Sequence, residues 1–362
     1  RELRVSRSAF ATIHLDALRH NLGRIRALAP RSRVMAVVKA DGYGHGLERV
    51  ARTLSGADAY GVAAIADGQR LRAAGIGHRI VVLSGIDEAG DLLEVRRLDL
   101  DIVVHHDHQL DLIAADRNPR PLRVWLKLDT GMHRLGFDPA RTDALLARLR
   151  ALPNVHPDIV LMSHFARSDE PLEAATPQQL ARFASATAAP LAHSIANSAA
   201  IVHFPDARQD WVRAGGALYG LSVEQDRCGA DDGFRPAMSL SSKLVAINRV
   251  AKGERVGYGG LYECPEDMAI GIVAIGYGDG YPRSAVTGTP VLLNGREAPI
   301  VGRVSMDLMM IDLRQHADAT INAVLLWGPE LPVERIATSA GTISYELTCG
   351  ITRRVLFLED EG

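Results

Sequence analysis

Lysine and cysteine are scarce in this chain of 362 residues. Of its 41 basic residues, 37 are arginines and only four are lysines, at positions 39, 127, 243 and 252. The three cysteines, Cys228, Cys264 and Cys349, are widely spaced and form no C-x-x-C pair, so neither a disulfide framework nor a cysteine-ligated zinc site is expected. The formal net charge of −2 argues against nucleic acid as a partner.

Long apolar runs and nucleotide-binding motifs are also missing. No stretch reaches the roughly 20 apolar residues of a membrane-spanning helix, and the N-terminal segment has no long apolar core. There is no G-x-x-x-x-G-K-[ST] motif, and the glycines of "DGYGHG" at 41–46 do not follow the spacing of a dinucleotide fingerprint. We therefore expect a cytoplasmic protein with neither a membrane span nor a nucleotide site of these types.

The first 220 residues alternate apolar, β-branched runs with amphipathic segments. Eight runs are candidate strands: 34–40, 59–65, 79–85, 101–106, 122–128, 159–164, 191–197 and 211–215. Amphipathic stretches lie between them, for example at 46–55, 67–74 and 140–152. This alternation indicates parallel βαβ units, and eight such units favour a closed (β/α)8, TIM-like barrel over an open sheet.

The composition changes after residue 221. Residues 222–236 are polar and contain Gly and Pro, as in a linker. Beyond them, closely spaced apolar runs and the hairpin signal Asn294-Gly295 indicate a mainly β domain, with one helix near 332–340. We predict an α/β protein of two domains, a barrel over residues 1–236 and a mainly β C-terminal domain over 237–362.

Chemistry is expected at the C-terminal ends of the barrel strands, where such barrels have their active sites. The polar residues at these ends are Lys39, Lys127, Arg134, His164, Asn197, Ser198 and Arg213. Only lysine can form an imine or a carbamate, because the arginine guanidinium stays protonated. Two lysines retained here in an arginine-rich chain indicate amine chemistry, although a lysine whose stem merely lies along a strand end would look the same.

Single motifs also have structural interpretations. The run "HHDH" at 105–108 resembles a metal cluster, but consecutive side chains on a strand alternate in direction, so a solvated loop is the better interpretation. Arg213 could end a strand in an ion pair, and Tyr258 could pack within a sheet. Taken singly, none of them identifies a reaction, and no metal site is predicted.

The combination of motifs is far more specific. "AVVKADGYGHG" resembles the cofactor-lysine signature of the bacterial alanine racemases, which are fold-type III pyridoxal-phosphate (PLP) enzymes. Other segments resemble the same family in the same order: LDALRHNL, KLDTGMHRLG, SHFARSDE, ANSAA, VRAGGALYGL, RPAMSL, VGYGG, GYGDGYPR, VGRVSMD and TISYEL. The family fold, a PLP-binding barrel followed by a β domain, matches the architecture expected above. One position departs from the pattern, since His133 precedes Arg134 where other members have glycine.

The resemblance implies that Lys39 holds PLP as an imine. Arg213 would face the pyridine nitrogen, where many PLP enzymes place a carboxylate. A guanidinium leaves that nitrogen unprotonated, which favours immediate return of a proton to Cα and therefore racemisation. The other residues implied in cofactor binding are Tyr43, His164, Asn197, Ser198, Gly215, Gly216 and Tyr345.

Racemisation requires an acid/base group on each face of the cofactor. The resemblance assigns Lys39 to one face and Tyr258 to the other, with His164 as a relay beside Arg213. An enzyme of this kind would interconvert L-alanine and D-alanine.

The resemblance also implies how the substrate would be held. Arg134 would bind the substrate carboxylate in a two-point contact that lysine could not reproduce, helped by the backbone N–H of Met306. Tyr277 would line a small pocket that suits alanine. Lys127 matches a lysine that family members often carry as a carbamate (N6-carboxylysine), whose negative charge would orient Arg134.

Tyr258 and Met306 come from the partner subunit in the family, so a head-to-tail homodimer with shared active sites is implied. Three rival functions stay open at this point. A non-catalytic PLP carrier would lack the C-terminal region, a decarboxylase of this fold type would use an acidic residue in place of Arg213, and a racemase for serine or several amino acids would share the whole site. The role could be D-alanine supply for peptidoglycan or alanine catabolism.

Overall fold

The computed structural model describes residues 9–224 and 226–362, which form two compact units. Arg19–Leu218 make up most of one unit, here called the barrel unit. The other, called the β-rich unit, contains residues 9–18 and Asp226–Gly362. The predicted domain ranges 1–236 and 237–362 stay predictions, and residues 1–8 and Gln225 within the first range lie outside the described residues.

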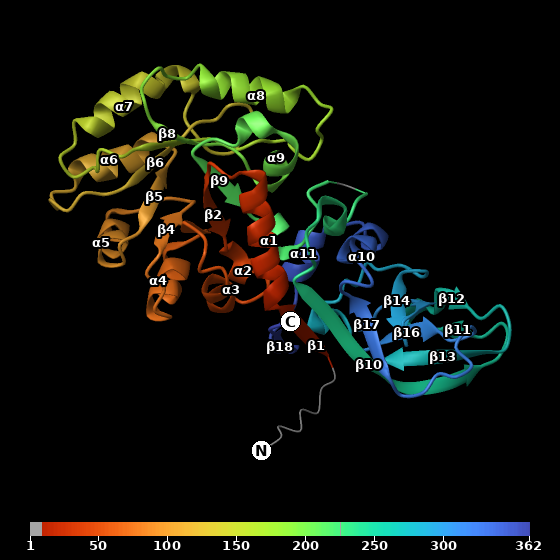
Figure 1. The fold of residues 1–362 in the computed structure, drawn as a ribbon. Coiled ribbons are helices and arrows are strands. Elements are labelled where there is room, and N and C mark those ends of the chain that lie inside the picture. The colour runs from red at the N-terminus through yellow and green to blue at the C-terminus, as the bar shows by residue number, and fades with distance from the viewer. Residues whose placement is uncertain (1–8, 225) are drawn as a thin grey trace. The chain divides into compact units, whose positions relative to one another are not determined.

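Eight parallel strands close into a barrel, as predicted (Figure 1). They are β2 (Arg33–Val37), β3 (Ala59–Val62), β4 (Arg79–Val82), β5 (Asp101–Val104), β6 (Val124–Lys127), β7 (Val160–Met162), β8 (Ala192–Ser194) and β9 (Trp211–Ala214). The barrel closes where β2 pairs with β9, with Arg33 opposite Trp211. Each strand is short, and all except β8 are mostly buried, which is why apolar runs marked them in the sequence.

Helices follow the strands and surround the barrel in Figure 1. The helical segments of this part of the chain are α1 (Leu15–Leu28), α2 (Lys39–Tyr43), α3 (Leu47–Thr53), α4 (Ile65–Ala73), α5 (Ala89–Arg97), α6 (Asp107–Ala115), α7 (Thr142–Arg150), α8 (Ala175–Ala184) and α9 (Ser198–His203). Helix α7 illustrates their pattern, because it buries Leu145, Leu146 and Leu149 on one side and exposes charged residues on the other.

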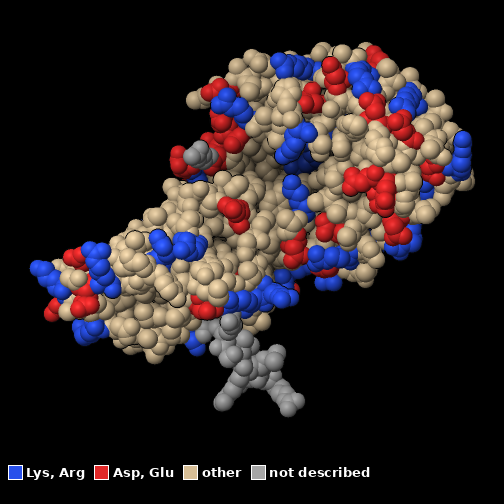
Figure 2. Space-filling model, turned by 180° about the vertical axis from the view of Figure 1, so that it is seen from behind, with Lys and Arg blue, Asp and Glu red and all other residues tan. Residues whose placement is uncertain are grey.

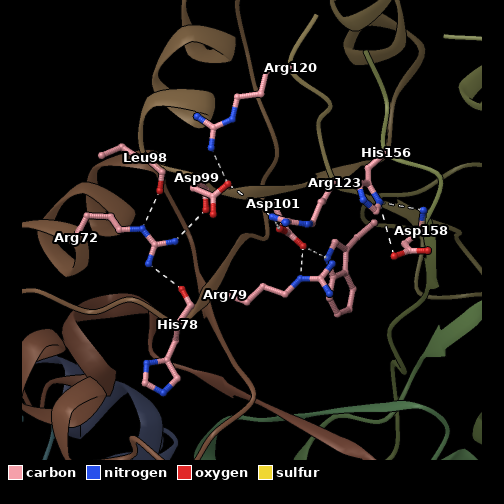
Figure 3. A network of polar contacts seen from close by, with 11 residues as sticks. Arg72, His78, Arg79, Leu98, Asp99, Asp101, Arg120, Arg123, His156 and Asp158 are labelled. Atoms are coloured by element: carbon pink, nitrogen blue, oxygen red, sulfur yellow. Dashed lines mark hydrogen bonds and ion pairs between the residues drawn. The ribbon is translucent and has the colours of Figure 1, made fainter. Parts of the chain in front are cut away.

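The barrel interior is packed with side chains. Trp125 and Trp211 are fully buried and meet edge to face with ring centroids 5.3 Å apart. Near the start of β5, the buried Asp101 carboxylate accepts hydrogen bonds from Arg79 and, at 2.9 Å, from the Trp125 indole (Figure 3). Burial raises the pKa of Asp101 despite the Arg79 charge. This network lies at the N-terminal ends of the strands, opposite the catalytic end of such barrels, so we assign it to stability.

The β-rich unit is built on a mostly antiparallel sheet with the strand order β15-β14-β17-β10-β1-β18, and β13 pairs with β10 and β16. Its strands are β1 (Phe10–His14), β10 (Met238–Val250), β11 (Arg255–Val256), β12 (Tyr262–Glu263), β13 (Met268–Val273), β14 (Pro290–Leu293), β15 (Arg296–Pro299), β16 (Met309–Asp312), β17 (Ala323–Trp327) and β18 (Leu356–Asp360). Strand β1 pairs antiparallel with β10 and parallel with β18. The first described strand of the chain therefore belongs to this sheet, although the predicted ranges grouped it with the barrel.

In the β-rich unit the predicted hairpin is confirmed, whereas the predicted number of helices is wrong. Asn294 and Gly295 both have positive φ, 52° and 74°, and join β14 to β15 as the expected hairpin. One helix was predicted near 332–340, but there are two, α10 (Val333–Ala340) and α11 (Ser344–Cys349). Gly341, with φ of 67°, ends the first of them, and α11 is too short to show a helical period in the sequence.

Charges of both signs are interspersed on the face seen in Figure 2, as a net charge of −2 leads one to expect. No helix within residues 9–224 and 226–362 combines the length and apolar character needed to cross a membrane.

Candidate functional site

Lys39 lies where the backbone leaves β2, at the start of an unusual turn. Although α2 spans Lys39–Tyr43, its residues Ala40, Asp41 and Gly42 have positive φ of 52°, 54° and 64°, so the chain forms a left-handed helical turn. The N–H of Gly42 donates to the carbonyl of Val38 at 2.9 Å. A non-glycine residue in this region costs roughly 1–2 kcal/mol, so the turn needs support from its surroundings.

Side chains supply that support. The carboxylate of Asp41 accepts a 2.7 Å hydrogen bond from Arg70, which also binds Glu48. The buried His45 ring contacts the carbonyl oxygens of Gly42 and Tyr43 at 3.1 and 2.9 Å. These contacts hold the segment that presents Lys39 at one end and Tyr43 at the other.

Tyr43, Ser198 and Gly215 converge although they are far apart in the sequence. A Cβ atom on Gly215 would lie 2.6 Å from the Tyr43 hydroxyl and 4.0 Å from Ser198 Oγ, so only glycine fits there. The N–H groups of Gly215 and Ala217 donate to Ser198 Oγ at 2.9 and 3.3 Å. Backbone donors and two hydroxyls around a glycine form a cradle of the kind that binds a phosphate.

Gly216, Ala217 and Asn197 lie next to or within this cradle, and only Gly216 and Asn197 were predicted. Gly216 begins a 3-10 turn, Gly216–Tyr219, directly after the cradle. Ala217 was not among the predicted residues, because an alanine backbone N–H leaves no signal in a sequence. Asn197 caps α9, since its side-chain oxygen accepts from the N–H of Ala200 at 3.0 Å, and it also accepts from the Ser168 hydroxyl at 2.8 Å.

Arg213, on β9, is a buried cation whose hydrogen-bond partners are neutral groups. Its guanidinium donates to the Ser194 carbonyl and hydroxyl, both at 2.8 Å, and to the Ser163 carbonyl at 2.6 Å. It also donates to Nδ1 of His164 at 3.2 Å. Burial lowers the pKa of Arg213 to about 10, which leaves it charged near neutral pH.

His164 is the partner of that cation. Burial, followed by the charges of Arg213 and Lys127, lowers its pKa well below the ordinary value. The imidazole is therefore neutral near pH 7, and its Nδ1 can accept the hydrogen bond from Arg213. The family resemblance implied that His164 stands beside Arg213, and the two side chains are in contact.

Lys127 lies buried at the end of β6. Burial, followed by the positive charges of Arg213 and Arg134, lowers its pKa to about 8, and Asp129 opposes the shift. A large fraction of its amine is consequently neutral at mildly alkaline pH. Such an amine is a nucleophile that an ordinary surface lysine does not provide.

Arg134 stands in the turn that follows β6. The carboxylate of Asp129 organises this turn by accepting backbone N–H bonds from Gly131, Met132 and His133, at 3.0, 3.1 and 3.0 Å. His133 has a positive φ of 56°, a backbone conformation that favours glycine. In this chain the His133 ring also contacts Asp129, at 3.2 Å.

Four predicted residues belong to the β-rich unit. Tyr258 and Met306 are exposed by 71% and 51%, and Tyr277 is exposed too. Backbone bonds hold the turns of Tyr277 and Met306 side by side, since the N–H of Gly278 donates to the Met306 carbonyl at 2.9 Å. Tyr345 is on α11, and its hydroxyl reaches the Ser222 carbonyl at 3.4 Å.

The "HHDH" run is not the solvated loop that we predicted. His106 caps α6, and Asp107 and His108 form its first turn. His105 is partly buried and contacts the Ser84 carbonyl at 2.9 Å. Among the residues that the structure describes, no group of three or more His, Cys, Asp or Glu is placed to hold a metal ion.

Comparisons with known proteins agree over most of the chain. The family models for the N-terminal and C-terminal domains of alanine racemase match residues 13–223 and 237–358. An alanine racemase of Nitrosococcus oceani is 50% identical over 346 residues, covering 95% of this chain and 97% of that protein.

Solved structures give the same result. The biosynthetic alanine racemase of Pseudomonas aeruginosa is 42% identical with a TM-score of 0.95, covering 98% of this chain and 99% of that one. The alanine racemase of Bartonella henselae, with covalently bound pyridoxal phosphate, is 25% identical with a TM-score of 0.88, covering 98% and 99%. This chain therefore belongs to the alanine racemases, a family of isomerases that in general depend on pyridoxal phosphate.

Proposed function

We propose that this chain interconverts L-alanine and D-alanine by a two-base mechanism, with PLP bound covalently to Lys39. The observation that supports the proposal best is the cradle of Tyr43, Ser198 and Gly215, which fits a phosphate. Its Tyr43 ends the turn that begins with Lys39. When bound, PLP would withdraw electrons from Cα of the substrate and so acidify its proton.

Arg213 would set the reaction type by facing the pyridine nitrogen. Besides Nδ1 of His164, its guanidinium donates to four neutral oxygens of Ser163, Ser194 and Ile195, so no carboxylate offsets its charge through these contacts. A cation there keeps the nitrogen unprotonated and the electron withdrawal weak, which favours return of the proton to Cα. The same feature argues against a decarboxylase, which would use an acidic residue at this position.

Two side chains would move the proton. Lys39 would act on one face of the substrate and Tyr258 on the other, because removal and return of the proton must occur on opposite faces. His164 would serve as a neutral relay beside Arg213, consistent with its lowered pKa. Asn197 would support the cradle from the cap of α9.

Three groups would hold the substrate. Arg134 would bind the carboxylate in a two-point contact, with help from the Met306 N–H, and Tyr277 would restrict the pocket to a small side chain. Tyr345 would add a hydroxyl to the phosphate site, together with the backbone of Gly216. Lys127 would react with carbon dioxide as a neutral amine, releasing a proton and forming a carbamate that orients Arg134.

A homodimer would complete the site. Exposed apolar side chains of the β-rich unit include Tyr258, Leu261, Tyr277, Met306 and Leu308. Large exposed apolar side chains commonly mark a binding surface. We propose that a second copy of the chain covers them and receives Tyr258 and Met306 in its own barrel site.

A direct experiment tests this function. The purified chain, supplied with PLP, is incubated separately with L-alanine, D-alanine and a panel of other amino acids that includes serine, and the products are separated by chirality. We expect both alanine antipodes to approach an equal mixture, and borohydride to fix the cofactor on Lys39. Absence of racemisation, or cofactor mass on another lysine, would contradict the proposal. Faster turnover of serine would favour a serine racemase.

A further inference from the structure

Gln179 is a buried polar side chain that the mechanism above does not use. It lies on α8, outside the strand ends that the sequence pointed to, and is only 3% exposed. Its amide oxygen accepts from the N–H of Ala166 at 2.9 Å. Its amide nitrogen donates to the Thr130 hydroxyl at 3.3 Å and to the His164 carbonyl at 3.1 Å. A buried amide with this many partners fixes the relative positions of the segments it joins.

The hydroxyl groups next to Gln179 form a chain with a defined direction. Ser163 Oγ donates to the Leu128 carbonyl at 2.9 Å, so it must accept the 2.8 Å hydrogen bond from Thr130 Oγ1. Thr130, having used its only proton, accepts from Gln179. Each hydroxyl donates once and accepts once, and reversing any member would leave a carbonyl unpaired.

This chain connects the two halves of the proposed site. Thr130 belongs to the turn that presents Arg134, and α8 holds the same turn through a second bond, from Arg182 to the Thr130 carbonyl at 3.2 Å. On the other side, the carbonyl of Ser163 accepts from Arg213, and His164 follows directly in the sequence. Gln179 thus contacts the turn that would bind the substrate carboxylate, through Thr130, and the segment of Ser163 and His164. That segment in turn binds Arg213, which would face the cofactor nitrogen.

We propose that Gln179, acting through Thr130 and Ser163, is a positioning residue that holds the Arg134 turn in register with the His164–Arg213 pair. The proposal rests on the proposed function for the roles of Arg134 and Arg213, and on the described contacts for the coupling. The amide of Gln179 binds Ala166, Thr130 and His164, so it would touch neither substrate nor cofactor. We therefore expect a change at Gln179 to affect substrate affinity more than turnover.

Thr130 offers a matched set of variants. Thr130→Val keeps the shape but removes the hydroxyl that links Gln179 to Ser163, whereas Thr130→Ser keeps that hydroxyl. We expect the valine variant to raise KM for both alanine antipodes about tenfold, with kcat changed less than threefold, because a lost buried hydrogen bond displaces the turn. Thr130→Ser should stay within twofold of the unaltered chain.

A buried hydroxyl on the same helix provides the control. Thr176 is fully buried on α8, and its Oγ1 has no hydrogen-bond partner among the described residues. Thr176→Val should therefore leave KM unchanged. An equal rise in KM for the Thr176 and Thr130 valine variants would reduce the effect to general packing and overturn the proposal.

A binding measurement separates this inference from the proposed function. Propionate has the carboxylate of alanine without its amino group, and its dissociation constant for the PLP-loaded chain can be measured by calorimetry without turnover. Thr130→Val and Gln179→Glu should each weaken propionate binding about tenfold, and the double variant should be no weaker than either single one. Unchanged propionate affinity, or additive losses, would overturn the coupling. Failure of the unaltered chain to racemise alanine would instead refute the proposed function.

Discussion

Lys127 shows how much burial changes the chemistry of a single residue. Its pKa of about 8 lies below the ordinary lysine value of 10.5, so the folded chain releases this proton before the unfolded chain does. The cost of burying the charge is therefore complete below pH 8, and it disappears as the pH rises from about 8 to about 10.5. A neutral side chain of similar length, such as methionine, should not pay this free-energy cost of burying a charge.

Lys127→Met tests this at the residue scale. In buffer free of carbon dioxide, we expect the variant to have a higher free energy of unfolding at pH 7, by up to about 3 kcal/mol, with the gap closing towards pH 10. Urea unfolding at several pH values measures it. Bicarbonate should stabilise the unaltered chain alone, because only lysine can form a carbamate. A difference in the free energy of unfolding that does not change with pH would contradict the lowered pKa of Lys127.

Tyr258→Phe tests the two-base proposal. Because L- and D-alanine are equally stable, overall racemisation must slow equally in both directions, so net rates cannot identify the missing base. Exchange of the α-hydrogen can. In D2O, D-alanine should still exchange through Lys39 without inverting, whereas exchange from L-alanine should fall by about 100-fold or more. Tyr262→Phe, which removes a hydroxyl that donates to Met268 Sδ, is the control. Equal exchange from both antipodes would exclude this role for Tyr258.

Residue types, and the family resemblance that their order reveals, predicted Lys39, Arg213 and His164 as site residues without any knowledge of geometry. They did not identify Ala217 or Gln179. The first contributes a backbone N–H that any residue would provide, and the second is an ordinary amide until its three partners surround it. The "HHDH" run shows the opposite error, because the cap and first turn of a helix were interpreted as a loop.

At the scale of elements, the left-handed turn of α2 was the least predictable feature. The sequence indicated a strand through residue 40, but the strand ends at Val37 and the chain then takes positive φ at Ala40 and Asp41. Alanine has no local reason to adopt that conformation, so tertiary contacts such as the Asp41–Arg70 ion pair must impose it.

Ala40→Gly should relieve part of this strain. We expect the free energy of unfolding to rise by about 1 kcal/mol, because glycine adopts positive φ without a steric penalty. Ala51→Gly, in the regular helix α3, is the matched control and should lower the free energy of unfolding by about 1 kcal/mol. Urea unfolding of both variants measures the difference. Destabilisation by both substitutions would mean that Ala40 is not strained.

At the scale of the whole molecule, the arrangement of active sites across a dimer can be tested by mixing inactive variants. Lys39→Ala removes the lysine of a subunit's own barrel site, and Tyr258→Ala removes the tyrosine that this subunit would give to its partner's site. After the two are unfolded and refolded together, up to about a quarter of full activity should return, because half of the dimers are mixed and each has one intact site.

The control pairs two barrel variants, Lys39→Ala and Arg134→Gln. Both changes lie in the barrel unit, so every site of a mixed dimer keeps one defect and no activity should return. Recovery in this control, or none in the Lys39 and Tyr258 mixture, would refute shared sites. Sedimentation of each variant checks that dimers form.

The sequence by itself determined the eight-stranded barrel, the β-rich region, the hairpin at Asn294 and the family, because apolar periodicity, turn chemistry and residue order are local properties of a chain. The tertiary structure decided the pairing of β1 with β10 and β18, the left-handed turn after Lys39, and the burial that shifts the pKa of Lys127 and His164. These features depend on contacts between residues far apart in the sequence. Such contacts stabilise the protein only after the chain has folded, so no local pattern predicts them.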